Sequence, residues 1–346
     1  MRQPGSLIGL RIGGLSLRLR PRAVVVCGAL TLIGLMLGIL LLGTGTLHLT
    51  PSEVIGSLFG AGGNPTAERI ILRIRLPRLV TAALVGAALG MAGAIFQSLS
   101  RNALGSPDII GFTTGAATGA ILQIMLFDAG PLGVSLAAFA SCVATAVAVL
   151  MLSMKNGATG GYRLVLIGVG VGAILSGINT ILLVKGGLDQ AAAAQLWLAG
   201  SLNTRTWAHV IPVALGFAAI VPVVVLNARQ TTLLEMSDDT ASQLGVTPER
   251  TRLTMVLAAV GLTAIATAAA GPIAFVALAG PQLARRLTSS PDLPLMSGAL
   301  MGTVLLLLAD LVSQRTPFHV NMPVGLTTGM LGGLYLLWLL KRKRTI

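Results

Sequence analysis

The sequence predicts an all-α polytopic membrane protein with about ten transmembrane helices and both termini in the cytoplasm. Of its 346 residues, 54% are hydrophobic and only 10% are charged, against about 25% charged in a typical soluble domain. Aromatic residues make up 4%, a proportion typical of membrane helices and not of a β-barrel with aromatic girdles. This composition excludes a soluble enzyme. The number and direction of the crossings follow from the uncharged windows and from the two basic ends.

Nine uncharged windows are candidates for crossing a bilayer, which needs about 20 apolar residues per helix. The seventh contains Gly271 and Pro272, and a proline removes an amide donor and clashes with the preceding helical turn. We therefore expect two helices joined by a tight turn there, and ten helices in all. The windows lie between the charged residues 22 and 53, 78 and 101, 108 and 128, 128 and 155, 163 and 185, 205 and 229, 252 and 285, 292 and 310, and 315 and 341.

Both ends of the chain are basic. Residues 1–22 form an arginine-rich leader and residues 341–346 a basic tail, and both are expected in the cytoplasm, on either side of a single transmembrane domain at 23–340. The first window is longer than the apolar region of a signal peptide, about 7–15 residues, so we expect an uncleaved first helix. Two cytoplasmic ends require an even number of crossings. Ten crossings place 17 of the 24 Lys and Arg residues on the cytoplasmic side.

Glycines at GxxxG spacing recur in the windows. Small residues four apart let two helix backbones approach closely in lipid, where no hydrophobic drive pulls helices together. The pattern predicts a tightly packed bundle. The pairs are Gly34/Gly38, Gly86/Gly90, Gly115/Gly119, Gly168/Gly172 and Gly329/Gly333.

The sequence offers no chemistry for catalysis. It has no Gly-Lys dipeptide and therefore no GxxxxGK[ST] phosphate loop, so the chain is not itself a P-loop ATPase. Its net charge of +13 is gathered in the tails and short connections, which favours an anionic membrane surface over nucleic acid as a partner. We expect no metal site and no cofactor on this chain, because its cysteines and histidines are scattered. They are Cys27, Cys142, His48, His209 and His319.

The richest polar segment, residues 229–252, lies between the sixth and seventh predicted helices on the cytoplasmic side. Ser237 is placed to cap a short helix whose first turn carries Asp238 and Asp239 at the positive end of the helix dipole. Gly245 ends that helix, and the Thr247 cap with proline after it starts a second one. We expect two short helices that project into the cytoplasm. Sequence alone leaves open a solvated connector and a docking element for a partner protein.

Five segments carry a resemblance to a known family. They are RLPR at 75–78, VGAALGMAGAIFQSLSRNALGSPDIIGF at 85–112, LEMSDDTASQLGV at 234–246, AGPIAFVALAGPQLARR at 270–286 and MPVGLTTGMLGGLYLLWLL at 322–340. These segments resemble the FecCD family, the permeases of ABC importers for iron-siderophore complexes, haem and vitamin B12, and within it the ferric-enterobactin-type siderophore permeases. The resemblance covers about residues 47–340.

The resemblance implies an assembly in a bacterial inner (plasma) membrane. A ten-helix subunit with the type II ABC importer permease fold would pair with a second FecCD-type permease subunit. The similarity to ferric-enterobactin-type permeases favours a heterodimer, and a homodimer is the alternative. Two separate ATPase subunits would bind ATP and Mg on the cytoplasmic side, and an extracytoplasmic siderophore-binding protein would deliver the solute.

The resemblance also implies three sets of site residues. The first docks onto the ATPase: Leu234, Glu235, Asp238, Asp239, Ala241, Leu244 and Gly245. The second holds the binding protein through guanidinium–carboxylate pairs: Arg75, Arg78 and the position of a third family arginine, which here is Gln314 with Arg315 after it. The third lines the path on the fifth and tenth helices: Ser176, Asn179, Thr180, Thr327 and Thr328. Two further departures from the family pattern are Ala103 in RNAL and Gln282 in GPQ.

The predicted function is that of a transmembrane permease subunit that moves iron(III)-siderophore complexes into the cytoplasm, driven by partner ATPases. An ion- or proton-coupled secondary transporter is the alternative. Such transporters place ionisable residues at mid-membrane depth, and Asp310, at the outer end of the ninth predicted helix, is the nearest candidate. A membrane scaffold without a solute path is a second alternative.

Overall fold

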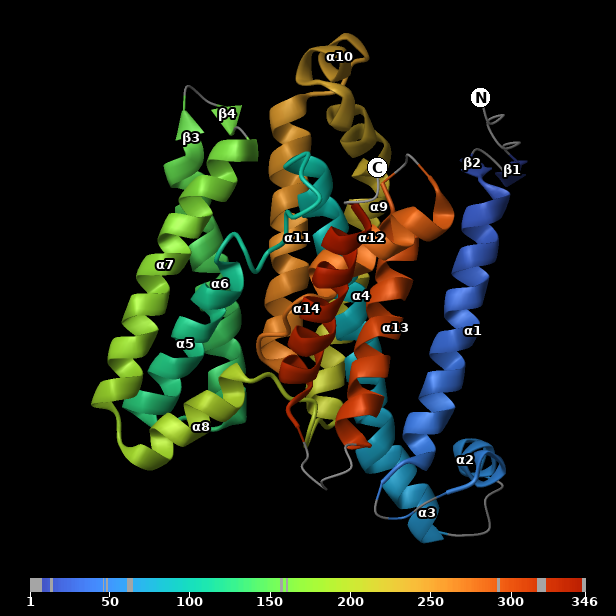
Figure 1. Ribbon diagram of the computed structural model, residues 1–346, viewed down its shortest axis with the longest axis vertical. Helices are drawn as coiled ribbons and strands as arrows, with labels where there is room; N and C mark the ends of the chain where they lie inside the picture. The colour runs from blue at the N-terminus through green and yellow to red at the C-terminus, as the bar shows by residue number, and fades with distance from the viewer. Residues whose placement is uncertain are drawn as a thin grey trace.

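The computed structural model describes residues 8–12, 15–45, 47, 49–60, 65–155, 158–159, 161–290, 293–315 and 322–343. Ten main helices correspond to the nine predicted windows, with two of them in the seventh (Figure 1). These are α1 (Pro21–Gly43), α4 (Leu76–Leu99), α5 (Phe112–Phe127), α6 (Pro131–Ser153), α7 (Gly161–Lys185), α9 (Trp207–Met236), α11 (Pro248–Ala270), α12 (Val276–Thr288), α13 (Leu295–Gln314) and α14 (Val324–Lys343). Shorter segments connect them: α2 (Pro51–Leu58), α3 (Pro65–Ile70), the π-helix η1 (Ile71–Arg75), α8 (Leu188–Leu198) and α10 (Asp238–Gln243).

Seven helices of the described chain are long and apolar enough to cross a membrane. One of them is the continuous run Pro65–Leu99, formed by α3, η1 and α4. Helix α5 and the first part of α14 are apolar but shorter, and α12 has only 13 residues, so ten crossings stay a prediction. Helix α1 begins and α14 ends at the same end of the molecule, as an even number of crossings requires (Figure 1).

The predicted break in the seventh window is confirmed. Helix α11 ends at Ala270, and Gly271 follows with φ of +74°, a conformation that favours glycine because it has no Cβ. Helix α12 begins only at Val276.

Two antiparallel hairpins depart from the all-helical prediction. Strand β1 (Ile8–Ile12) pairs with β2 (Leu15–Leu19) within the leader, and β3 (Met154–Lys155) pairs with β4 (Ala158–Thr159) between α6 and α7. The sequences of β1 and β2 place apolar residues at every second position, which is the period of a strand and not of a helix. Residues 1–7 and 344–346 of the predicted leader and tail lie outside the described residues.

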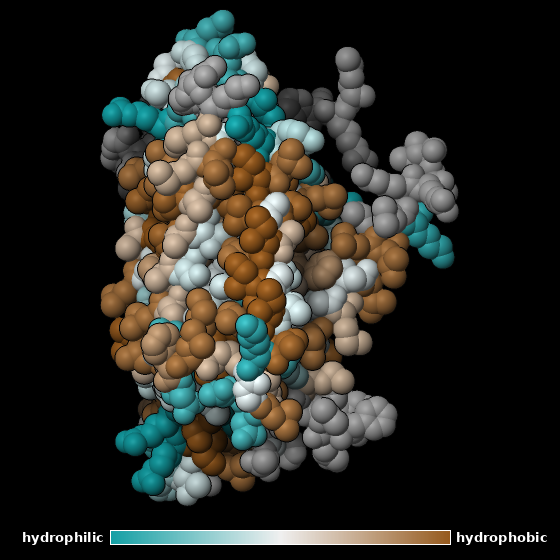
Figure 2. Space-filling view, turned by 90° about the vertical axis from the view of Figure 1, so that its left-hand side faces the viewer, coloured by the Kyte–Doolittle hydropathy of each residue, from teal (hydrophilic) through white to brown (hydrophobic). Residues whose placement is uncertain are grey.

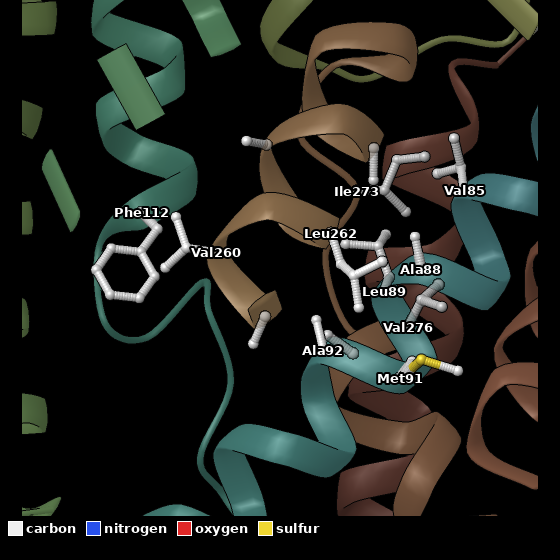
Figure 3. Close-up of a cluster of buried hydrophobic side chains, with 14 of the residues drawn as sticks. Val85, Ala88, Leu89, Met91, Ala92, Phe112, Val260, Leu262, Ile273 and Val276 are labelled. Carbon is white, nitrogen blue, oxygen red and sulfur yellow. The ribbon is translucent and has the colours of Figure 1, made fainter. Parts of the chain in front are cut away.

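Helix α4 forms the centre of the bundle and is buried along most of its length. Its Val85 and Leu89 lie in one apolar cluster with Leu262 of α11 and with Val276 at the start of α12 (Figure 3). The same helix packs against α13, α11, α12 and α9. A helix with so many neighbours moves only together with them, because packed interiors have few voids to absorb a displacement.

Glycine packing is confirmed for three of the five GxxxG pairs and fails for one. A Cβ on either glycine of these three pairs would touch the backbone or side chains of a neighbouring segment. At Gly34/Gly38 the neighbours are only side chains, and Gly329/Gly333 faces open space. The three close pairs are Gly86/Gly90 against α13, Gly115/Gly119 against α6 and Gly168/Gly172 against the connection that precedes α5.

The surface has the banding of a membrane protein. Figure 2 shows a broad hydrophobic belt between two hydrophilic ends on the face of the molecule that includes α6 and α7. Large apolar side chains are exposed along α7, among them Ile174 and Val184. So large an apolar surface is unfavourable in contact with water, and in a bilayer it contacts lipid or another membrane subunit.

Candidate coupling and transport sites

The segment at 229–252 folds differently from the predicted pair of short helices. Helix α9 continues to Met236, α10 is a single short helix, and the predicted second helix is the first turn of α11. The extension has a simple cause: no glycine or proline interrupts the sequence between Asn227 and Met236, so nothing ends α9 earlier. The part that projects is therefore α10 with its two flanking turns, at the end of the molecule where α1 begins (Figure 1).

The ends of α10 have the geometry that the sequence predicts. The Ser237 hydroxyl accepts a hydrogen bond from the Thr240 backbone N–H at 2.9 Å, which satisfies a donor that the first helical turn leaves open. Gly245 has φ of +80° and ends the turn. Thr247 precedes α11 without a side-chain cap, and Pro248 occupies the first turn there.

Four ion pairs lie around the start of α10. Asp238 accepts hydrogen bonds from Arg101, after α4, and from Arg252 of α11, each at 2.9 Å. Arg252 also pairs with Glu249 at 2.6 Å. Glu235 accepts from Arg285 of α12 at 2.6 Å, and the Leu234 carbonyl accepts from Arg101 at 2.7 Å. The segment is thereby tied to α4, α11 and α12.

The seven predicted coupling residues divide into an anchored and an exposed set. Leu234 and Ala241 are buried in the main core, and Glu235 and Asp238 are used in the ion pairs above. Asp239, Leu244 and Gly245 are exposed, with the Leu244 side chain 61% accessible. Sequence reasoning missed Arg101, Arg252 and Arg285, which it used only as boundaries between windows or as inside charges.

At the opposite end, Arg78 forms an ion pair inside the chain. Its Nη2 and Nε donate to the two carboxylate oxygens of Asp310, at 2.6 and 3.2 Å, and its Nη1 donates to Asn203 Oδ1 at 2.8 Å. Gln314 Nε2 donates to the same carboxylate at 3.0 Å. The Asp310 side chain is 1% exposed and that of Arg78 is 24% exposed. Asp310 is thus paired with a cation inside the chain, as buried charges in membrane proteins commonly are.

The other predicted outer residues point in different directions. Arg75 donates to the carbonyl oxygens of Leu42 and Leu47, at 2.6 Å each, and so joins η1 to the end of α1. Arg315 is exposed after α13. Arg73, which sequence reasoning did not select, is exposed on the same turn region as Arg75. A count of cations alone gives no sign of which guanidinium turns inward.

The five predicted path residues lie on two helices that have different neighbours within the chain. Helix α7 packs against α5 and α6, whereas α14 packs against α13 and α12. Ser176 and Thr180 are exposed on α7 and Asn179 is buried. Thr327 and Thr328 are both buried, and Thr328 lines a small cavity of about 210 Å³ beside Phe275.

A larger cavity, of about 490 Å³, lies on the adjacent face of α14. Asp108, from the connection between α4 and α5, is its one charged lining residue among the described part of the chain. Sequence reasoning used Asp108 only as a boundary between windows. The cavity walls come from α5, the end of α8, the break after α11 and the start of α14: Thr113, Leu198, Ala199, Pro272, Ala274, Gly325, Leu326, Gly329 and Met330.

No group of three or more His, Cys, Asp or Glu side chains in the described ranges is placed to hold a metal ion. His209 Nδ1 accepts a hydrogen bond from the Thr206 backbone N–H at 3.3 Å, at the start of α9. His48 and His319 lie outside the described residues.

Comparison with known proteins decides the family. Residues 30–342 match the FecCD transport family. The chain belongs to this family. The ferric enterobactin transport system permease protein FepG of Escherichia coli is 44% identical over 92% of this chain and 96% of its own length. The probable siderophore transport system permease protein YfhA of Bacillus subtilis is 35% identical over 91% of this chain and 94% of its own length.

The fold of a FecCD permease is also shown by a solved structure. An inward-facing conformation of a metal-chelate type ABC transporter has a TM-score of 0.82 and 26% identity, over 92% of this chain and 99% of that one. The predicted family and its permease fold are therefore confirmed, and the chain is a membrane transport permease of this family.

Two of the three positions at which the sequence departs from the expected FecCD pattern, Ala103 and Gln282, lie together. Gln282 Nε2 donates to the Ala103 carbonyl oxygen at 2.6 Å, and both residues line a polar cavity of about 400 Å³ near Arg101 and Glu235. The neutral amide of Gln282 therefore joins α12 to the connection that follows α4. The contact joins the side chain of Gln282 to the backbone of Ala103.

Proposed function

We propose that this chain is the transmembrane permease subunit of an ABC importer that moves iron(III)-siderophore complexes into the cytoplasm, with ATP hydrolysis on separate subunits. The observation that carries the proposal is the 44% identity, over 92% of the chain, to a permease named for ferric enterobactin. A second relative, from Bacillus subtilis, is named for import of Fe(3+)-citrate and is 34% identical over 94% of this chain. Both names describe iron(III) bound to an organic ligand.

The ATPase would dock on the exposed residues of α10 and its turns: Asp239, Leu244 and Gly245. Movement of α10 would then pass through Asp238 to Arg101 and Arg252, and through Glu235 to Arg285. Charge-assisted hydrogen bonds are short and directional, so they transmit a displacement to α4, α11 and α12. The seven coupling residues would therefore have three roles. The exposed residues would contact the ATPase, Glu235 and Asp238 would pass the movement on, and Leu234 and Ala241 would hold the segment in the core.

The binding protein would dock at the opposite end. We propose that Arg75, Arg78, Gln314 and Arg315 belong to this surface. Arg315 is exposed and could pair with a carboxylate of the binding protein. Arg78 is already paired with Asp310, so only the exposed part of its guanidinium could contact the binding protein. The continuous run Pro65–Leu99 joins this end to Arg101 at the other end, so the two docking surfaces are mechanically connected by one helix.

The path would be completed by a second FecCD-type permease, a heterodimer being favoured by the relative named above. Ser176 and Thr180 on α7 are exposed to such a partner, and Asn179, Thr327 and Thr328 would reach the path when the helices move. Ten crossings would place the leader at 1–22, the coupling segment and the tail at 341–346 in the cytoplasm, around a transmembrane domain at 23–340.

The test is uptake of radioactive ferric enterobactin by cells that lack the gene and by cells that carry it on a plasmid. The proposal predicts that uptake requires the gene, stops when ATP is depleted and persists when an uncoupler removes the proton gradient. Uptake that persists without ATP and stops with the uncoupler would replace the proposal by a secondary transporter. Equal uptake with and without the gene would favour the second alternative, a membrane scaffold without a solute path.

A further inference from the structure

Asp108 is partly buried in the connection between α4 and α5, outside the membrane-spanning helices. The connection that carries it begins after α4 at the α10 end of the molecule and turns back into the bundle, where α5 starts (Figure 1). Gly111 lies against Gly168 and Gly172 of α7. At 1.5 Å per residue, Gly172 is about 16 Å along α7 from its start at Gly161. Non-helical backbone at such depth is tolerated only where protein covers it or where it lines a cavity.

The Asp108 carboxylate has no cationic partner in this setting. Its cavity of about 490 Å³ has no other charged group in its lining, as far as the structure describes the chain. The elements packed around it contribute aliphatic side chains, glycine, proline and the Thr113 hydroxyl, which donates to the carboxylate. The nearest titratable residues on α8 and at the end of α5, Asp189 and Asp128, lie at the far ends of those helices. They are carboxylates and would not neutralise it.

Burial raises the pKa of Asp108 to about 6, with the Thr113 hydrogen bond acting in the opposite direction. A carboxyl group in an apolar site resists ionisation, since the charged form loses its hydration. The neutral acid has an O–H donor that the carboxylate lacks. Near pH 6 the side chain therefore changes between an acceptor that repels oxygen atoms and a donor that binds them.

Iron(III) chelates built from oxygen ligands present many hydrogen-bond acceptors and few donors on their surface. The cavity has space for part of such a ligand, and its α14 wall, formed by Leu326, Gly329 and Met330, is one helical face at i, i+3 and i+4. That face differs from the one that carries Thr327 and Thr328, which are buried. A solute in this cavity would meet aliphatic walls and a single polar group.

We propose that Asp108 is a specificity-determining residue of the transport path, which contacts the oxygen atoms of the passing iron chelate as a neutral acid that donates a hydrogen bond. This inference rests on the proposed function. It assigns the cavity beside α14 as a contact site for the solute. It also gives the importer a pH dependence that has its origin in the membrane subunit.

The test compares Asp108→Asn, Asp108→Ala and the control Asp128→Asn in the complete importer, reconstituted with its ATPase and binding protein and supplied with radioactive ferric enterobactin. Asn keeps an N–H donor at every pH, and Ala removes it. Asp128 is an exposed carboxylate after α5 in a left-handed backbone conformation, which asparagine tolerates. Uptake is measured at pH 6 and pH 8.

At pH 6 we expect wild-type and Asp108→Asn uptake within about twofold of each other, and Asp108→Ala about three- to tenfold lower, the range that one lost hydrogen bond gives. At pH 8 wild-type and Asp128→Asn uptake should fall about fivefold or more, because the neutral fraction of a group with a pKa of about 6 drops from about a half to about one hundredth. Asp108→Asn should not fall. Equal pH profiles for wild type and Asp108→Asn, or full uptake by Asp108→Ala, would overturn the inference.

A second measurement separates this inference from the proposed function. A hydrophobic carbodiimide reacts with neutral carboxyl groups in apolar sites, and mass spectrometry locates the modified residue. In the intact complex we expect Asp108 to be modified at pH 6, much less at pH 8, and less at pH 6 when ferric enterobactin and the binding protein are present. Absent or pH-independent modification overturns the role of Asp108. No ATP-driven uptake by the wild type overturns the proposed function, whatever the modification shows.

Discussion

The ion pair between Arg78 and Asp310 gives the sharpest test of the internal packing. Changing Arg78 to Met removes the guanidinium and leaves an Asp310 side chain that is 1% exposed, with Gln314 as a hydrogen-bond donor. Breaking a buried pair from one side costs about 3–5 kcal/mol, and the partial exposure of Arg78 argues for the lower end, about 3 kcal/mol. For a chain of 346 residues, an unfolding entropy of about 2.1 cal/mol/K per residue gives about 1.4 °C per kcal/mol, so we expect the thermal midpoint of the purified protein to fall by about 4 °C.

The double variant Arg78→Met, Asp310→Leu isolates the cause. Replacing both charges by apolar groups removes the unpaired carboxylate, so stability should return to within about 1 kcal/mol of the wild type. Arg73→Met is the matched control, because Arg73 is exposed on the preceding turns, and it should shift stability by less than about 0.5 kcal/mol. A midpoint of Arg78→Met equal to that of the control, or a double variant as unstable as the single one, would refute the reasoning.

Three further predictions concern coupling and packing. Asp239→Arg, on the exposed part of the coupling segment, should abolish co-purification of the ATPase while the protein stays in the membrane; retained association would count against docking there. Glu235→Gln should keep co-purification but lower ATP-driven uptake about threefold or more by weakening the contact to Arg285, and unchanged uptake would exclude that link. Gly302→Ala puts a Cβ against the Gly86 carbonyl and should cost about 1–3 kcal/mol in thermal unfolding, whereas Gly170→Ala, which meets open space, should cost nothing.

The sequence predicts the helices well because their signals are local. A run of uncharged residues long enough to span a bilayer identifies a helix wherever it packs, and Gly271 with Pro272 ends α11 as expected. The Ser237 cap and the Gly245 turn are likewise set by neighbouring residues. The hairpin in the leader does not follow from the charge and composition of residues 1–22, because its signal is the alternation of apolar residues along β1 and β2.

Which side chains pair with each other depends on contacts between distant parts of the chain. Patterns of neighbouring residues in the sequence do not predict these contacts. Arg78 and Asp310 are separated by 232 positions, so nothing local indicates that Arg78 turns inward. Asp108 lies between two helices in sequence, which suggests a surface connection, yet its segment turns back into the bundle. For such residues the useful signal is a carboxylate in an otherwise apolar stretch, which deserves a functional hypothesis before its position is known.

The central claim is that this chain conducts an iron chelate but takes its energy from nucleotide hydrolysis on other subunits. The most direct test reconstitutes the purified chain in liposomes in two forms, with its partner permease alone and with the partner permease, ATPase and binding protein together. We predict uphill accumulation of radioactive ferric enterobactin only in the complete assembly with ATP. Uphill accumulation by the permease subunits alone, driven by an ion gradient, would contradict the account.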